Sequence, residues 1–223
     1  LATISACKRD VDELPLERTF VREFYVQGEW RDTNQTQYTS FDYTVGKPVI
    51  VSYDNTYTCK SFAIRQLDGR KAIYSEILGT STKPLFSIYF PSAAPIYPSA
   101  NPAWLKTELD TFFVPGREFS ITGAPGDPVL GLELPGAANS FFLNSLSDSK
   151  GAPTPGGRIT VLSVNDFEWM SGIGLGDPAV RKGKQVTISF EAKLGRLGIV
   201  NGIPQVVGEA EVRNGEATLF FEY

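Results

Sequence analysis

The chain has 223 residues and a formal net charge of -4 at pH 7, and 42% of its residues are hydrophobic while 21% are charged. These values are typical of a folded globular protein and exclude wholesale disorder. Lys and Arg are scattered along the chain, so we expect no nucleic-acid partner.

The first seven residues, LATISAC, end in Cys7, which follows an aliphatic residue and two small ones. This pattern resembles the bacterial lipobox, in which the Cys becomes the lipid-bearing first residue of the mature chain. The charged run that follows is typical of a solvated tether. We expect a signal-peptide remnant at residues 1–6 and a lipidated Cys and tether at residues 7–18. Two alternatives remain open: a disulfide between Cys7 and Cys59, or an ordinary apolar strand.

In the first half of the chain, aromatic and β-branched segments alternate with turn signals. Alternation of polar and apolar residues with a period of two indicates half-buried strands. The dipeptide Asp68-Gly69 is a hairpin signal, which predicts a turn between two of these strands. The expected strands cover residues 20–26, 38–45, 47–53, 57–67, 71–78 and 85–90.

The middle of the chain predicts a loop and the one helix. Residues 91–104 contain four Pro and no periodicity, and Pro lacks the N–H that a strand ladder needs. Within residues 101–109, Asn101 is a good helix cap and Pro102 suits the first helical position. We therefore expect a loop over residues 91–104 that leads into one or two helical turns.

The second half of the chain returns to strand patterns. Asn214-Gly215 predicts a hairpin turn, and the Pro- and Gly-rich residues 147–157 predict a flexible loop. The expected fold is all-β, an antiparallel two-sheet sandwich or flattened barrel with at most one short helix, formed by a single domain over residues 19–223. The expected strands cover residues 112–114, 118–122, 129–134, 158–164, 184–193, 205–212 and 216–223.

Three motifs in the last third occur in a recognisable order: GRITV at residues 157–161, TISFEA at 187–192 and VRNGEATL at 212–219. This order, over about residues 156–223, together with the lipobox resembles small surface lipoproteins of the Bacteroidota type, whose function is generally unknown. The sequence departs from the pattern at Ala217, where a large apolar residue is usual. The resemblance implies a β-sandwich that is anchored to the outer membrane by lipid and lies at the cell surface, and it carries over no catalytic residue.

The residue content argues against catalysis. The chain contains no His, so a Ser-His or Cys-His nucleophile pair is excluded and the commonest metal ligand is missing. Two Cys cannot close a structural zinc site unaided. No two carboxylates are spaced in a way that identifies a glycosidase pair, and none form a calcium-binding loop. We therefore expect a protein that is not an enzyme, with no cofactor and no metal site.

Aromatic residues in turn-rich segments are the candidate contact residues: Tyr97, Trp104, Trp30 and Trp169. Exposed rings on loops of a β-sandwich stack on sugars or on partner proteins. The alternative is that each Trp closes one end of the core. We expect a binding module for an extracellular ligand such as a glycan, with the loop at residues 91–104 as its contact. A second hypothesis is an accessory or scaffold subunit of an outer-membrane protein complex that has no small-molecule ligand.

The lipobox makes the first testable prediction. Protein purified from native membranes should begin at Cys7 and carry a lipid on that residue, because signal peptidase cleaves before the modified Cys and a triacylated Cys anchors stably. Mass spectrometry of the N-terminal peptide measures this. An unmodified peptide that retains residues 1–6, or a disulfide between Cys7 and Cys59, contradicts the prediction.

Overall fold

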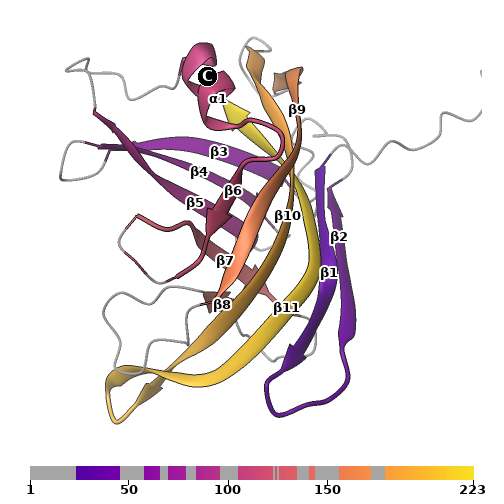
Figure 1. Ribbon diagram of the computed structural model, residues 1–223, viewed down its shortest axis with the longest axis vertical. Helices are drawn as coiled ribbons and strands as arrows, with labels where there is room; N and C mark the ends of the chain where they lie inside the picture. Colours follow the sequence, from indigo (N-terminus) through magenta and orange to yellow (C-terminus); the bar gives the residue numbers. More distant parts are fainter. Residues whose placement is uncertain are drawn as a thin grey trace, which may run out of the picture.

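The computed structural model describes residues 24–45, 58–65, 70–78, 84–95, 105–122, 124, 126–134, 141–143, 156–171 and 179–223 (Figure 1). No helix among them is long and apolar enough to cross a membrane. The elements are β1 (Phe24–Asp32), β2 (Thr39–Val45), β3 (Thr58–Arg65), β4 (Arg70–Leu78), β5 (Pro84–Pro95), α1 (Lys106–Phe112), β6 (Glu118–Ser120), β7 (Val129–Glu133), β8 (Phe141–Leu143), β9 (Gly157–Ser171), β10 (Ala179–Val200) and β11 (Ile203–Glu222).

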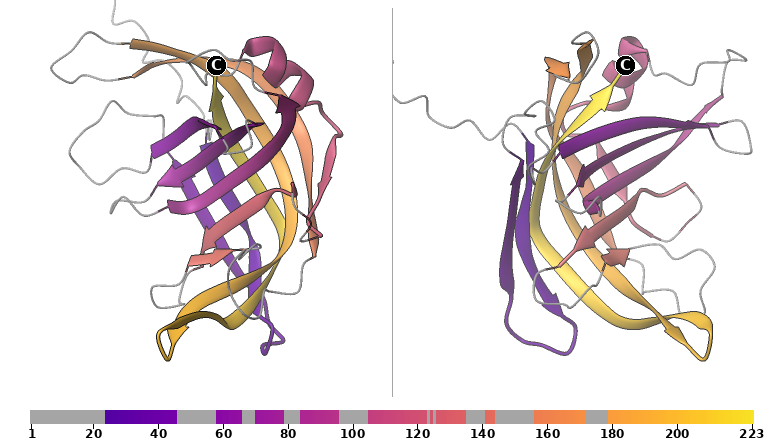
Figure 2. Two further views of the ribbon diagram at one scale, coloured as in Figure 1. Left: turned by 90° about the vertical axis from the view of Figure 1, so that its left-hand side faces the viewer. Right: turned by 180° about the vertical axis from the view of Figure 1, so that it is seen from behind.

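The all-β fold with one short helix is confirmed. Antiparallel ladders join the described strands into one network in the order β2-β1-β11-β10-β8-β7-β5-β4-β3, and β9 and β6 extend it from β10. The network folds into two layers, with β2, β1, β11, β10, β9 and β6 in the first and β8, β7, β5, β4 and β3 in the second. The strands of the two layers cross each other (Figures 1 and 2). The layers do not close into a barrel, as in a sandwich.

β10 is long enough to take part in both layers. Its first part, Ala179–Ala192, pairs with β9, and Gly195 and Arg196 then pair with β8. β9 and β8 therefore pair with successive stretches of the same edge of β10, and the second layer begins beyond the stretch that pairs with β9. Across the layers, the buried Ser75 of β4 donates a hydrogen bond of 2.8 Å to the carbonyl of Phe220 on β11.

Aromatic rings lie over glycines in the core. A Cβ on Gly215 would lie 2.6 Å from the ring of Phe190, and one on Gly28 would lie 2.9 Å from the ring of Phe41. Both rings are buried, so a larger residue at either position displaces them. Ala217 is fully buried in the same core.

The prediction of a hairpin turn at Asn214-Gly215 is wrong. Asn214 has a φ of 50° and lies inside β11, whose registers with both β1 and β10 shift at this point. It is therefore a β-bulge. The turn is formed by the chain's other Asn-Gly pair, Asn201 (φ 54°) and Gly202 (φ 77°), which joins β10 to β11. Asn-Gly signals left-handed backbone, and a bulge accommodates that conformation as well as a turn does.

Two further expectations in the middle of the chain are corrected. Residues 91–95, expected as loop, belong to β5, where the register with β4 is irregular. The described pairing of β5 with β7 ends at Tyr89, and Pro is tolerated on an edge of this kind. The strand expected at residues 112–114 is absent, because Phe112 ends α1 and Phe113 caps it.

The helix begins later than the sequence indicates. The Leu105 N–H donates a hydrogen bond of 2.8 Å to the Glu108 carboxylate, which fixes the first turn. Leu109 and Phe113 are buried and seat the helix on the end of the core. The ring of Phe113 lies 4.5 Å from that of Phe221 on β11. Burial of this face, rather than the Pro signal, therefore determines where the helix forms.

A buried lysine joins α1 to the first layer. The Lys184 side chain is 6% exposed, and its ammonium contacts Asp110 of α1 and, at 2.5 Å, Asp166 of β9. Lys106 of α1 contacts the same Asp166 carboxylate. Burial lowers the pKa of Lys184, but the hydrogen bonds to the two carboxylates outweigh it and the pKa lies above its usual value. The hydrogen bonds from Lys106 and Lys184 hold the pKa of Asp166 below its usual value.

This cluster predicts an asymmetry in stability. Replacing both Asp110 and Asp166 by Asn leaves an ammonium buried without a carboxylate, and should lower the Tm by roughly 5 °C or more. Lys184→Met should lower the Tm by less, because the two carboxylates that it leaves unpaired by Lys184 are 44% and 54% exposed and stay hydrated. Thermal unfolding at neutral pH compares the variants. The exposed Glu168, 3.1 Å from Lys182, provides a control in Glu168→Gln, which should leave the Tm nearly unchanged.

The same cluster predicts how stability depends on pH. The folded-state pKa of Asp166 lies below its ordinary value of 3.8. Its contribution is therefore complete above that pH and is lost as the pH falls through the folded pKa. Native protein should lose this increment on acidification, and Asp166→Asn should not. Equal acid sensitivity of the two proteins contradicts the prediction.

Candidate functional site

The outer face of the first layer is polar from β2 to β9. Residues that lie opposite each other in an antiparallel ladder share a face, so the register identifies the members of this face. They are Ser40, Asp42, Thr44, Tyr25, Gln27, Glu29, Arg31, Glu211, Arg213, Glu216, Thr218, Thr187, Ser189, Glu191, Lys193, Arg158, Thr160 and Ser163.

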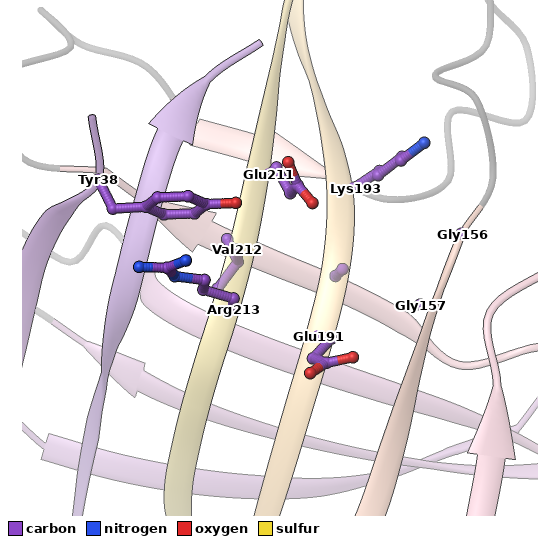
Figure 3. Close-up of a pocket in the computed structure, with 9 residues that line it drawn as sticks. Tyr38, Gly156, Gly157, Glu191, Lys193, Glu211, Val212 and Arg213 are labelled. Atoms are coloured by element: carbon purple, nitrogen blue, oxygen red, sulfur yellow. The ribbon is translucent and has the colours of Figure 1, made fainter. Parts of the chain in front are cut away.

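A pocket of about 300 Å³ lies on this face (Figure 3). Glu191 and Lys193 of β10 and Glu211 and Arg213 of β11 line it, together with Tyr38, which directly precedes β2, and the backbone at the start of β9. Four charged groups and one aromatic ring from three segments of the chain therefore meet in one place.

Glycine forms one side of the pocket. Gly157 has a φ of 144°, and a Cβ there would lie 2.1 Å from the carbonyl oxygen of Glu191. The backbone of Gly156 accepts a hydrogen bond of 2.9 Å from the Lys193 N–H. Because neither residue has a side chain, β9 approaches β10 closely and the pocket is bounded there by backbone.

Tyr38 is held by two arginines and a carboxylate. The guanidinium carbon of Arg213 lies 3.6 Å from the centre of the Tyr38 ring, and that of Arg31 lies 4.8 Å from it. These are cation–π contacts, which fix the plane of the ring. The Tyr38 hydroxyl points toward Glu211 (Figure 3) and helps to lower the pKa of that carboxylate.

Each arginine is also paired with a carboxylate across β1 and β11. Arg31 donates two hydrogen bonds to Glu211, of 3.0 Å from Nε and 2.6 Å from Nη2. Arg213 Nε donates one of 2.9 Å to Glu29. Two ion pairs therefore lie side by side between β1 and β11. The acid is on β1 in the first pair, Glu29 with Arg213, and on β11 in the second, Arg31 with Glu211.

The bulge at Asn214 makes part of this arrangement possible. Asn214 Nδ2 donates a hydrogen bond of 3.0 Å to the same Glu29 oxygen that Arg213 contacts. Consecutive residues of a regular strand point to opposite faces. The extra residue removes that alternation, so two successive side chains reach one carboxylate.

The carboxylates of the site are held ionised. Hydrogen bonds from Arg31 lower the pKa of Glu211 despite partial burial, and Tyr38 and Lys193 add to the effect. Hydrogen bonds from Asn214 and Arg213 lower the pKa of Glu29. Both groups are therefore hydrogen-bond acceptors, and not proton donors, at neutral pH.

Of the contact residues predicted from sequence, only Trp30 has a side chain that the structure describes. Trp30 is 9% exposed and packs in the core, on the face of β1 that points away from the pocket. Trp169 lies on β9 opposite Arg181, and its side chain is outside the described part. Tyr97, Trp104 and Cys7 also lie outside the described residues.

The pocket residues were not singled out from the sequence. The sequence pattern that could have pointed to them is Glu-x-Arg, which occurs at residues 29–31 and again at 211–213. In an antiparallel pair, two such segments place each acid opposite a base. Among the described residues, no group of three or more His, Cys, Asp or Glu could hold a metal ion.

No protein-family model, curated protein or solved structure matches the chain.

The burial of Trp30 predicts a structural role. Trp30→Ala should destabilise the protein by about 3–5 kcal/mol, because it removes a large buried ring. Urea unfolding measures this, with Tyr38→Ala as the comparison, since that ring is half-buried and its loss should cost clearly less. A cost for Trp30→Ala no larger than that for Tyr38→Ala contradicts the assignment.

Proposed function

We propose that this chain is a non-catalytic binding module of a surface lipoprotein, and that it holds an uncharged, polyhydroxylated ligand such as a glycan beside Tyr38. The observation that carries the proposal is the pocket between Tyr38 and the start of β9, where charged donors and acceptors converge. Ligand sites combine a concave surface with a few fixed polar groups in this way.

The balance of charge indicates an uncharged ligand. Two carboxylates, Glu191 and Glu211, and two cations, Lys193 and Arg213, line the pocket. A strongly charged ligand is attracted by one pair and repelled by the other. Sugar hydroxyls both donate and accept hydrogen bonds, so they match carboxylate acceptors and ammonium or guanidinium donors at once.

Preorganisation supports binding rather than chemistry. Tyr38 and Arg213 are fixed by their contacts with each other and with Glu211 and Glu29, so little side-chain freedom is lost when a ligand enters. The lowered pKa values of Glu29 and Glu211 suit acceptors. Glycoside hydrolysis needs a carboxylic acid with a raised pKa.

The extracytoplasmic location depends on the lipobox at residues 4–7. The location and the ligand are separate parts of the proposal, because the pocket requires no anchor.

A binding experiment tests the ligand. A panel of immobilised polysaccharides is screened with the full chain, and positives are measured by calorimetry. Tyr38→Ala and Glu191→Gln should each weaken binding by about tenfold or more, which is about 1.4 kcal/mol or more. Glu168→Gln, on β9 but outside the pocket, should bind as the native protein does. Unchanged affinity in both pocket variants, or no glycan bound, overturns the proposal.

A further inference from the structure

The far end of the β10–β11 hairpin projects as a two-stranded finger, which we define as residues 197–207. On one edge, β8 pairs with β10 only as far as Arg196. On the other edge, the register of β1 with β11 ends at Ala210. Among the described residues no third strand flanks the finger, which lies at the end of the molecule opposite α1 (Figures 1 and 2).

The finger is apolar and carries no charged residue, with the sequence LGIVNGIPQVV. Val200 and Val207 are 38% and 41% exposed. An uncharged, β-branched strand edge favours pairing with another strand. A two-stranded hairpin also gains stability from additional strands.

The two edges of the finger differ. Val200 and Ile203 lie opposite each other across the two-residue turn, and in such a hairpin this pair exchanges its backbone hydrogen bonds. In the next pair, Ile199 and Pro204, the backbone groups therefore point outward. Pro204 has no N–H, which blocks the β11 edge, whereas Ile199 presents both an N–H and a carbonyl on the β10 edge.

We propose that the β10 edge of the finger pairs with the same edge of a second copy of this chain. The open stretch runs from Leu197, just beyond the last residue paired with β8, to Asn201 in the turn. A two-fold antiparallel pairing needs one residue opposite itself, and Ile199 is the centre of this stretch. Ile199 then exchanges two backbone hydrogen bonds with Ile199 of the second copy.

The lack of charge on the finger and the block at Pro204 favour a second copy of this chain over any other partner at the β10 edge. Because the finger has no charged residue, self-pairing brings no like charges together. Pro204 prevents a further copy from adding to the β11 edge, so the assembly closes at two. A lipid surface is a poorer match, because the nearest charged residues, Arg196 and Glu209, have opposite signs and the finger has no aromatic residue.

The small overlap sets the strength of the dimer. Only five residues of each chain meet. The interface is therefore far smaller than the roughly 1,200–2,000 Å² that standard, stable interfaces bury. The association is therefore weak and reversible, and it is observed at high protein concentration. Tethering to a membrane raises the local concentration and favours the same contact.

Sedimentation velocity of the full chain over a wide concentration range tests the proposal, under reducing conditions that prevent a disulfide between copies. Native protein should shift toward dimer as its concentration rises. Ile199→Lys and Ile199→Asp should each lower the association constant by about tenfold or more, because residue 199 then faces a like charge. An equimolar mixture of the two variants should associate again, since Lys then faces Asp.

Val207→Lys is the matched control, since it adds a charge to the other strand of the finger and should leave the dimer intact. Thermal unfolding of each variant confirms that the fold is retained. Three results overturn the proposal: native protein that stays monomeric at millimolar concentration, a dimer unaffected by both substitutions at residue 199, or variants that fail to associate when mixed.

Discussion

The pairing of β10 with β11 is the constraint on which the other elements depend. The two strands lie side by side from Gly183 and Glu222 to Val200 and Ile203. Their inner face supplies a large part of the core, their outer edges seat β1, β9 and β8, and their far end forms the finger. A shift of one residue in this register would exchange the apolar and polar faces of the strand that shifts.

One irregularity in that pairing sets both the core and the site. The bulge at Asn214 places Gly215 beneath the Phe190 ring and turns Arg213 and Asn214 toward Glu29. The Arg213 guanidinium in turn lies over Tyr38. The position of the aromatic ring at the pocket therefore follows from a backbone feature on a neighbouring strand.

Local alternation explains what the sequence predicts well. The strands expected at residues 71–78, 158–164 and 184–193 lie within β4, β9 and β10, and β7 covers all but the last residue of the strand expected at 129–134. The full lengths of β9 and β10 were not predicted, because these two strands continue through polar and glycine-containing segments that lack strict alternation. Here tertiary pairing, and not local preference, extends the strand.

The two Asn-Gly pairs show a second limit. Asn201-Gly202 and Asn214-Gly215 have the same local chemistry, and both Asn residues have positive φ. One forms a turn and the other a bulge, because only the first has strands that pair back across it. Partners far away along the chain decide between the two outcomes, so a local signal cannot.

The candidate site was hidden for the same reason. Arg213 and Glu29 are 184 residues apart, and Arg31 and Glu211 are 180 apart. Each residue by itself resembles an ordinary charged residue of a solvated face. Sequence reasoning instead favoured aromatic residues near turns, and Trp30, which satisfies that criterion, lies in the core.

The finger and the pocket lie on the same two strands, which gives the two proposals a common consequence. Lys193 is six residues from Ile199, a distance of about 20 Å along an extended strand. A two-fold axis through an antiparallel pair keeps each face of the sheet on its own side. The two pockets of a dimer therefore face the same way, on the order of 40 Å apart along the strands. A long polymer can occupy both pockets, and its second contact forms at a high effective concentration, whereas a small free sugar gains nothing from the dimer.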